Sequence, residues 1–153
     1  ASSISATYSN SIENTFETGE IKHLSDSSLS IVPLGIKEGK NLGFAYINGS
    51  KKIIIKNLEG TDGESLESGV TSIITARNGY IYYVKDSAIY RRSLTDTTEK
   101  EVKLSGELKI KTDFFDIDED FFYFFAEDTT KSTKTSLYRV ELKSSSKTPE
   151  KMA

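Results

Sequence analysis

The sequence predicts an all-β fold made of repeated antiparallel sheets, and three observations lead to this prediction. First, one pattern occurs three times along the 153 residues: an aromatic strand, a turn, a second strand that ends in Leu, and a polar turn. Second, Asn-Gly, Asp-Gly and Ser-Gly pairs, which favour tight turns, separate the strand candidates. Third, no segment of useful length shows the apolar period of a helix. Self-similarity at this spacing is typical of repeat architectures.

The N-terminal segment precedes the repeats. Residues 1–18 are rich in Ser, Thr and Asn and show little periodicity, which indicates a linker or a partial strand. Residues 20–24 alternate polar and apolar side chains, as a half-buried strand does. We therefore expect residues 1–28 to form a linker that includes a possible outer strand of an incomplete unit.

Three units of four strands follow within residues 29–153. The first spans residues 30–68, with strand candidates at residues 31–36, 42–47, 51–58 and 64–67. The second spans residues 69–105, with strand candidates at residues 71–76, 80–84, 88–93 and 99–104. The third spans residues 106–153, with strand candidates at residues 111–117, 121–127, 136–142 and 149–152. Short strands rich in aromatic and β-branched residues, joined by turns, predict an antiparallel sheet in each unit.

Constant offsets align the units residue by residue. An offset of 36 relates the third strands of the first two units, and Leu94 aligns with Leu142 (142 − 94 = 48). An offset of 41 relates the second strands of the last two units, since it pairs Ile81 with Phe122. The difference, 48 − 41 = 7, is an insertion in the polar tract at residues 128–135. A hairpin loop tolerates such an insertion.

The alignment also predicts the core. We expect these residues to be buried between adjacent sheets: Ile81, Tyr83, Ile89, Phe122, Phe124 and Leu137. The aromatic run at residues 121–125 is typical of an inner strand that is buried on both faces. The alternative is an aromatic platform for a ligand.

Units of about 40 residues with four short antiparallel strands are typical of propeller blades. The clearest unit reads Ile81-Tyr82-Tyr83, then Ile89-Tyr90-Arg91, then Leu94-Thr95-Asp96-Thr97. This pattern resembles bacterial β-propeller repeats that are similar to the propellers of low-density-lipoprotein-receptor-related proteins. The resemblance covers about residues 30–153. It implies a propeller-like fold of three four-stranded antiparallel blades, without enzyme activity.

Three blades are fewer than the four to eight that usually close a propeller. The expected architecture is therefore a partial or a self-completing propeller. An open end exposes an apolar face or an unpaired strand edge, which proteins usually cover. We therefore expect a protein partner, either a second copy of the chain or the remainder of a longer one.

Composition narrows the classes of function. The formal net charge is −3, and Lys and Arg are mixed with Asp and Glu, which argues against nucleic-acid binding. The sequence contains no Cys, which excludes disulfides, thiol catalysis and cysteine-ligated metals. No apolar run approaches the roughly 20 residues of a membrane-spanning helix. We expect no cofactor and an extracellular or cell-surface location, with the cytoplasm as the alternative.

An acidic cluster is a candidate calcium site. Asp116, Asp118 and Asp120 have the alternate spacing that presents oxygens to Ca²⁺, although the Gly and Glu of an EF-hand loop do not follow. The alternative is an acidic turn that keeps the neighbouring aromatic strands from aggregating.

A set of arginines is a candidate binding site. Arg91, Arg92 and Arg139 recur at matched strand positions. Such a row could bind a carboxylate or a sugar. The alternative is a packed row of salt-bridged side chains that covers the strand faces.

Two hypotheses of function follow. The first is a non-enzymatic binding or scaffold module that uses propeller blades for protein or carbohydrate interaction. The second is a propeller-type lyase or hydrolase with a site built from loops. The single histidine, His23, has no second His or Cys with which to form a catalytic set, which favours the first hypothesis. An enzyme should show a deep polar pocket with titratable residues from several blades. A different all-β fold, such as a sandwich, is a third interpretation of the repeats.

Overall fold

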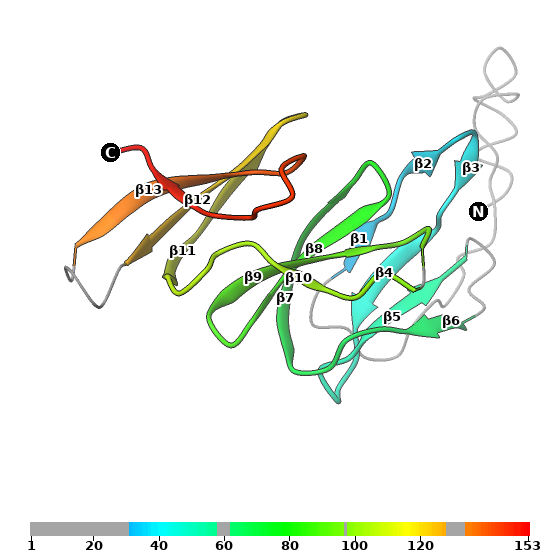
Figure 1. The fold of residues 1–153 in the computed structure, drawn as a ribbon. Helices are drawn as coiled ribbons and strands as arrows, with labels where there is room; N and C mark the ends of the chain where they lie inside the picture. The colour runs from blue at the N-terminus through cyan, green and yellow to red at the C-terminus, as the bar shows by residue number, and fades with distance from the viewer. Residues whose placement is uncertain (1–30, 58–61, 97, 128–133) are drawn as a thin grey trace, which may run out of the picture.

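Three four-stranded antiparallel sheets follow one another along the chain in the computed structural model (Figure 1). The structure describes residues 31–57, 62–96, 98–127 and 134–153, and these residues form strands, turns and loops without a helix. The all-β prediction is therefore confirmed. The predicted linker and outer strand within residues 1–28 lie outside the described residues. No helix in the described part of the chain is long and apolar enough to cross a membrane.

The first sheet has the order β1-β4-β5-β6, with a short β2-β3 hairpin beside it. The bounds are β1 (Ile31–Pro33), β2 (Ile36–Lys37), β3 (Lys40–Asn41), β4 (Phe44–Ile47), β5 (Ile53–Lys56) and β6 (Asp62–Ser65). The strand predicted at residues 31–36 is interrupted, because Gly35 has a φ of 78°. Gly43, at a φ of 84°, lies so close to β5 that a Cβ would be 2.0 Å from the Lys56 carbonyl oxygen. These glycines separate the hairpin from the sheet.

The second sheet has the order β10-β9-β8-β7 and is a simple meander. The bounds are β7 (Val70–Arg77), β8 (Tyr80–Lys85), β9 (Ala88–Ser93) and β10 (Val102–Lys103). The Asn78-Gly79 turn joins β7 to β8, and both of its residues have a positive φ, as a two-residue hairpin turn requires. The predicted outer strand at residues 99–104 is shorter than expected, because only two residues of β10 pair with β9.

The third sheet has the order β11-β12-β13-β14. The bounds are β11 (Lys109–Ile117), β12 (Phe121–Glu127), β13 (Thr135–Glu141) and β14 (Glu150–Lys151). The pairing of β12 with β13 is regular, and it places Phe124 opposite Tyr138. The corresponding pair in the second sheet is Tyr83 opposite Tyr90. The sheets therefore repeat in register as well as in sequence.

Two hydrophobic cores hold the sheets in a row (Figure 1). Between the first and second sheets lie Leu34, Ala45, Ile47, Ile53, Val70, Ile73, Ile81 and Tyr83. Between the second and third sheets lie Tyr82, Ile89, Leu104, Phe122, Phe124, Ala126, Tyr138, Val140 and Leu142. Among the described residues no core cluster joins the first sheet to the third. Within the described residues, the second sheet thus packs against a sheet on both faces, whereas each terminal sheet packs against a sheet on one.

Side chains of β8 point alternately into the two hydrophobic cores. Ile81 and Tyr83 point to the first sheet, and Tyr82, between them, points to the third. The Tyr82 ring stacks on Phe122, with 5.4 Å between ring centroids. Burial of Ile81, Tyr83, Phe122 and Phe124 agrees with the sequence prediction, since each has 0% of its surface exposed.

Candidate functional site

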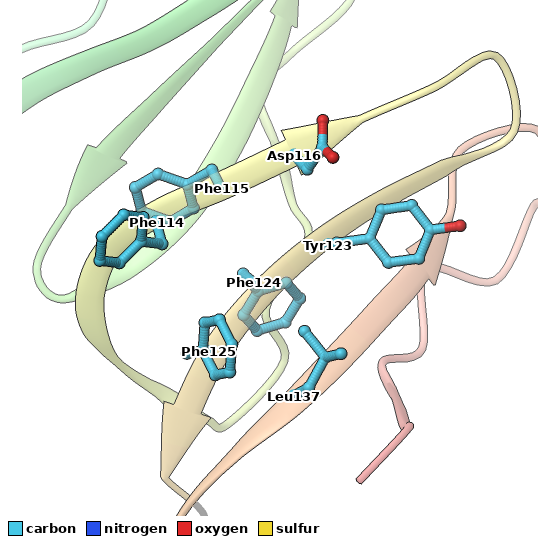
Figure 2. Close-up of a pocket in the computed structure, with 7 residues that line it drawn as sticks. All are labelled: Phe114, Phe115, Asp116, Tyr123, Phe124, Phe125 and Leu137. Atoms are coloured by element: carbon cyan, nitrogen blue, oxygen red, sulfur yellow. The ribbon is translucent and has the colours of Figure 1, made fainter.

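The outer face of the third sheet is apolar, and no other sheet of the described residues covers it. Phe114 is 76% exposed, Phe125 37% and Met152 42%. A hollow of about 460 Å³ lies on this side of the sheet (Figure 2). The lining residues, drawn in Figure 2, are Phe114, Phe115, Asp116, Tyr123, Phe124, Phe125 and Leu137.

An irregularity in β11 produces the hollow. Ile110 pairs with Ala126 and Phe115 pairs with Phe124, so residues 111–114 lie opposite Phe125 alone. A bulge of this kind bends a strand and leaves its extra residues unpaired. The Phe114 side chain is consequently carried away from the core, and the hollow opens between β11 and β12.

The repeat explains why this face is apolar. At an offset of 48, Leu137 corresponds to Ile89, which is 0% exposed in the core between the second and third sheets. Met152 corresponds to Leu104 at the same offset, and Leu104 is also 0% exposed. The equivalence holds in the backbone: Leu104 N–H donates to the Ile89 carbonyl at 2.8 Å, and Met152 N–H donates to the Leu137 carbonyl at 2.7 Å. The outer face of the third sheet therefore carries the residues that elsewhere form an inter-sheet core.

Two predictions of burial are wrong for this reason. Leu137, expected in the core, is only half-buried. The run at residues 121–125 is not buried on both faces: Phe122 and Phe124 are enclosed, whereas Phe125 is exposed and Phe121 is half-buried. Alternation along β12 sends these side chains to opposite faces, and among the described residues no sheet covers the outer one.

The three predicted arginines do not lie on one face. Arg91 and Arg139 correspond at an offset of 48, and each guanidinium stacks on an aromatic ring at 4.1 Å from its centroid. The rings belong to Tyr80 and Phe121, which correspond at an offset of 41. Arg92 is adjacent to Arg91 on β9 and so points to the opposite face.

Three of the four arginines of the chain are paired with a glutamate. Arg92 forms an ion pair with Glu67 of the first sheet. Arg77 binds Glu119, with 2.7 Å between Nη2 and Oε1. Arg139 donates from Nε to Oε2 of Glu150 at 3.0 Å.

Arg91 differs from all of them. It is 9% exposed and pairs with no carboxylate of the described residues. Its Nη2 donates to the carbonyl oxygen of Leu142 at 3.1 Å, and its buried Nε has no partner in the structure. The Nε of Arg92 is also without a partner, but Glu67 balances that charge.

Arg91 lines a polar cleft of about 640 Å³ at one end of the interface between the second and third sheets. The cleft is lined by Lys37, Arg77, Asn78, Tyr80, Tyr82, Arg91, Ile117, Asp118, Glu119, Leu142, Lys143, Ser144, Ser145 and Lys147. Its five basic side chains exceed its two acidic ones, in a chain of net charge −3. The cleft is therefore a local concentration of positive charge.

The ionisable groups of the cleft reflect this charge. Burial, and next the repulsion of Arg91, lower the pKa of the Lys147 ammonium. Burial raises the pKa of the Tyr82 hydroxyl, although a hydrogen bond with Arg91 opposes the shift. Hydrogen bonds from Arg77 and then Asn78 lower the pKa of Glu119, which stays ionised. The positive charges of Arg91 and Lys147 are thus close together in a partly desolvated part of the cleft.

The candidate calcium ligands lie in the turn between β11 and β12. Asp118 closes that turn, because its Oδ1 accepts hydrogen bonds from the backbone N–H groups of Asp120 at 2.8 Å and Phe121 at 2.7 Å. Asp116 accepts from the neighbouring Ile117 N–H, and Asp120 pairs with Lys143 at 3.1 Å. In the described part of the chain no group of three or more carboxylate or imidazole side chains is arranged to hold a metal ion.

A second polar cluster lies on the other side of the second sheet. Glu101 accepts a hydrogen bond from the Tyr83 hydroxyl and pairs with the ammonium of Lys85. Burial, then the bond to Glu101, raises the pKa of Tyr83, so this hydroxyl stays protonated. The groups satisfy one another, and they bind the second sheet together rather than face a ligand.

Comparison with models of protein families, with curated proteins and with solved structures finds no match to this chain. The site is therefore argued from its own geometry. Sequence reasoning did not identify the cleft, although the signal was present. The offset that aligns Arg91 with Arg139 also aligns Val102 with Glu150 (150 − 102 = 48), which shows that Arg91 has lost the partner that Arg139 keeps.

Proposed function

We propose that this chain is a non-enzymatic binding module of propeller-type blades that associates with a second copy of itself through the outer face of its third sheet. The observation that carries the proposal is the correspondence between that face and a buried core. Leu137 and Met152 are exposed or half-buried, whereas their counterparts Ile89 and Leu104 are fully buried. Exposed apolar surface of this kind usually marks a partner site.

The chain also carries a surface that fits this face. Residues of the second sheet that pack on the first include Ile73 and Tyr90. Strand register relates them to Ile31 and Ile54 on the side of the first sheet that no other described sheet covers, which we call its free side. Ile31 is 60% exposed and Ile54 is half-buried. The free side of the first sheet therefore repeats the surface that covers a preceding sheet.

Association of these two faces is head-to-tail. Such contacts close into a ring when the rotation between copies permits it, and otherwise they extend into a filament. Two copies in a ring would contain six sheets, and propellers usually have four to eight.

Sedimentation velocity over a wide range of protein concentration tests the proposal. We expect a species larger than the monomer that grows with concentration, and Leu137→Asp should remove it. Ile36→Asp is a matched control, because Ile36 is 70% exposed but lies on the β2-β3 hairpin. A wild-type chain that stays monomeric at every concentration would overturn association with a second copy and leave the remainder of a longer chain as the partner.

The cleft between the second and third sheets meets part of the criterion for an enzyme, since titratable groups from several sheets line it. Their chemistry supports binding instead. The pKa values of Asp118 and Glu119 are lowered and that of Tyr82 is raised. Each of these three shifts moves the group away from neutral pH, where a general acid or base is most effective. The pKa of Lys147 is shifted toward neutral pH, but no carboxylate is ion-paired with it among the described residues.

A further inference from the structure

We propose that the cleft between the second and third sheets binds a hydroxylated carboxylic acid, whose carboxylate pairs with Arg91 and Lys147. This site is separate from the outer face of the third sheet, so the inference does not rest on self-association.

The first argument is the unbalanced charge of Arg91. Buried charges in proteins are nearly always paired, because an unpaired ion loses its hydration without compensation. Arg91 is 9% exposed and leaves its Nε without a partner. Its guanidinium donates to the Leu142 carbonyl, stacks on the Tyr80 ring and interacts with the Tyr82 hydroxyl, all of which are uncharged groups. None of these contacts neutralises a guanidinium. An anion in the cleft would do so.

The second argument is that the third sheet contains a complete version of the arrangement around Arg91. In the third sheet, Arg139 stacks on Phe121 and is neutralised by Glu150 from the adjacent outer strand. In the second sheet, Arg91 stacks on Tyr80 in the same way, but Val102 is the residue that β10 places opposite it. Both sheets thus contain an arginine that stacks on an aromatic ring, but only the third sheet contains a glutamate that neutralises it. A ligand carboxylate would complete the second pair.

The third argument is the surroundings of Arg91. Arg77 is neutralised by Glu119, and Lys143 is paired with Asp120. Lys147 has only the Ser144 carbonyl as its partner, and both its burial and its proximity to Arg91 disfavour its charge. Glu141 and Glu99 favour the charge of Lys147 more weakly, and neither forms an ion pair with it. Two adjacent cations without an ion-paired carboxylate among the described residues form an electrostatic site for one anion.

The size and lining of the cleft indicate what carries the carboxylate. A volume of about 640 Å³ is far greater than a carboxylate group needs. Beside the cations, hydroxyl-bearing residues line the cleft, among them Ser144, Ser145 and Tyr82. Hydroxyls both donate and accept hydrogen bonds, so they suit a ligand with hydroxyl groups of its own. Arginine is well suited to the carboxylate, because its planar fork matches the two oxygens.

The test is a titration followed by NMR of the arginine Nε–Hε groups at constant ionic strength. The chain has only four arginines, and the Arg91 signal is assigned from its loss in Arg91→Lys. Sodium glucuronate is the probe, and glucose is the matched neutral control with the same ring. We expect glucuronate to shift the Arg91 signal in a saturable manner and glucose to leave it unchanged. An unshifted Arg91 signal, or an equal response to glucose, would overturn the proposal.

Two variants and a control locate the site. Val102→Glu should supply the missing internal carboxylate, pair with Arg91 and weaken glucuronate binding by roughly tenfold or more, as expected for a lost charge-assisted contact. Lys147→Gln removes the second cation without altering the core and should weaken binding severalfold. Lys103→Gln removes one exposed positive charge from the adjacent position of β10 and should leave binding unchanged. Equal affinity in Lys147→Gln and the wild type would show that the cleft is not the site, whatever the folding of Val102→Glu.

Discussion

The second and third sheets present the same side-chain pattern in the same direction, but in the part of the chain that the structure describes only the second has a neighbouring sheet on that side. Ile89 and Leu104 are fully buried there, whereas Met152 is 42% exposed and Leu137 is half-buried at the corresponding places of the third sheet. The pattern of a repeat thus sets which way a residue points. Whether the residue is buried depends on the next sheet.

The second and third sheets also differ in how the corresponding arginines, Arg91 and Arg139, are neutralised. Arg139, at the open face, has the partner Glu150 on its own outer strand. Arg91, at the covered face, has Val102 opposite it and a cleft beside it. An apolar residue at this position suits a face that packs against another sheet. It also leaves a buried positive charge that an external anion can neutralise.

The largest effect is expected on the free energy of unfolding when two neighbouring residues of β12 are truncated separately. Phe124 is 0% exposed and Phe125 is 37% exposed. Phe124→Ala should lower the free energy of unfolding by about 3–5 kcal/mol, because it opens a cavity in the inter-sheet core. Phe125→Ala should cost about 1 kcal/mol, near the range of surface changes. Equilibrium urea unfolding at low protein concentration measures both, and equal costs would contradict the one-sided burial of this strand.

A second comparison uses corresponding residues of two sheets. Ile89→Ala should cost about 2–5 kcal/mol, since Ile89 is 0% exposed. Leu137→Ala should cost about 1 kcal/mol in the monomer. The same unfolding experiment at high protein concentration sharpens the test, because association would bury Leu137 and increase the cost of its truncation. A cost of Leu137→Ala that does not depend on concentration would speak against a second copy on this face.

A smaller effect concerns the ion pair of Arg139. Glu150→Gln should lower the melting temperature by a few degrees at most, because both side chains are solvent-accessible and exposed ion pairs contribute little. The difference should disappear in roughly 1 M salt, which screens exposed charges. Thermal unfolding at two salt concentrations measures it, and a large effect that persists in salt would show that the pair is buried in solution.

The smallest effect is a pH dependence at the turn before β12. Backbone hydrogen bonds from Phe121 and Asp120 lower the pKa of Asp118. A lowered folded-state pKa gives stability that is present above the unfolded value of about 3.9 and is lost as the pH falls through the folded value. Asp118→Asn should therefore reduce the loss of melting temperature between neutral pH and the acid range below about pH 4. An unchanged loss would contradict the role of Asp118 in closing the turn.

The sequence was a good guide to the strands and a poorer guide to the surfaces. Alternation and turn residues located β8, β9 and β12 closely. β8 and β12 carry nearly continuous apolar runs and end at the charged residues Lys85 and Glu127. The strand predicted at residues 31–36 was too long, since Gly35 interrupts it. The bulge that exposes Phe114 had no signature in the periodicity, because its residues still read as strand.

By itself the sequence determined the all-β class, the three four-stranded units and the direction in which each core residue points, because these follow from local turn chemistry and a period of two. Only the tertiary structure decided that Leu137 is half-buried and that Arg91 is a buried cation without a carboxylate. Burial and charge balance depend on which sheet lies against which, and that arrangement is a property of packing between distant segments rather than of any local pattern.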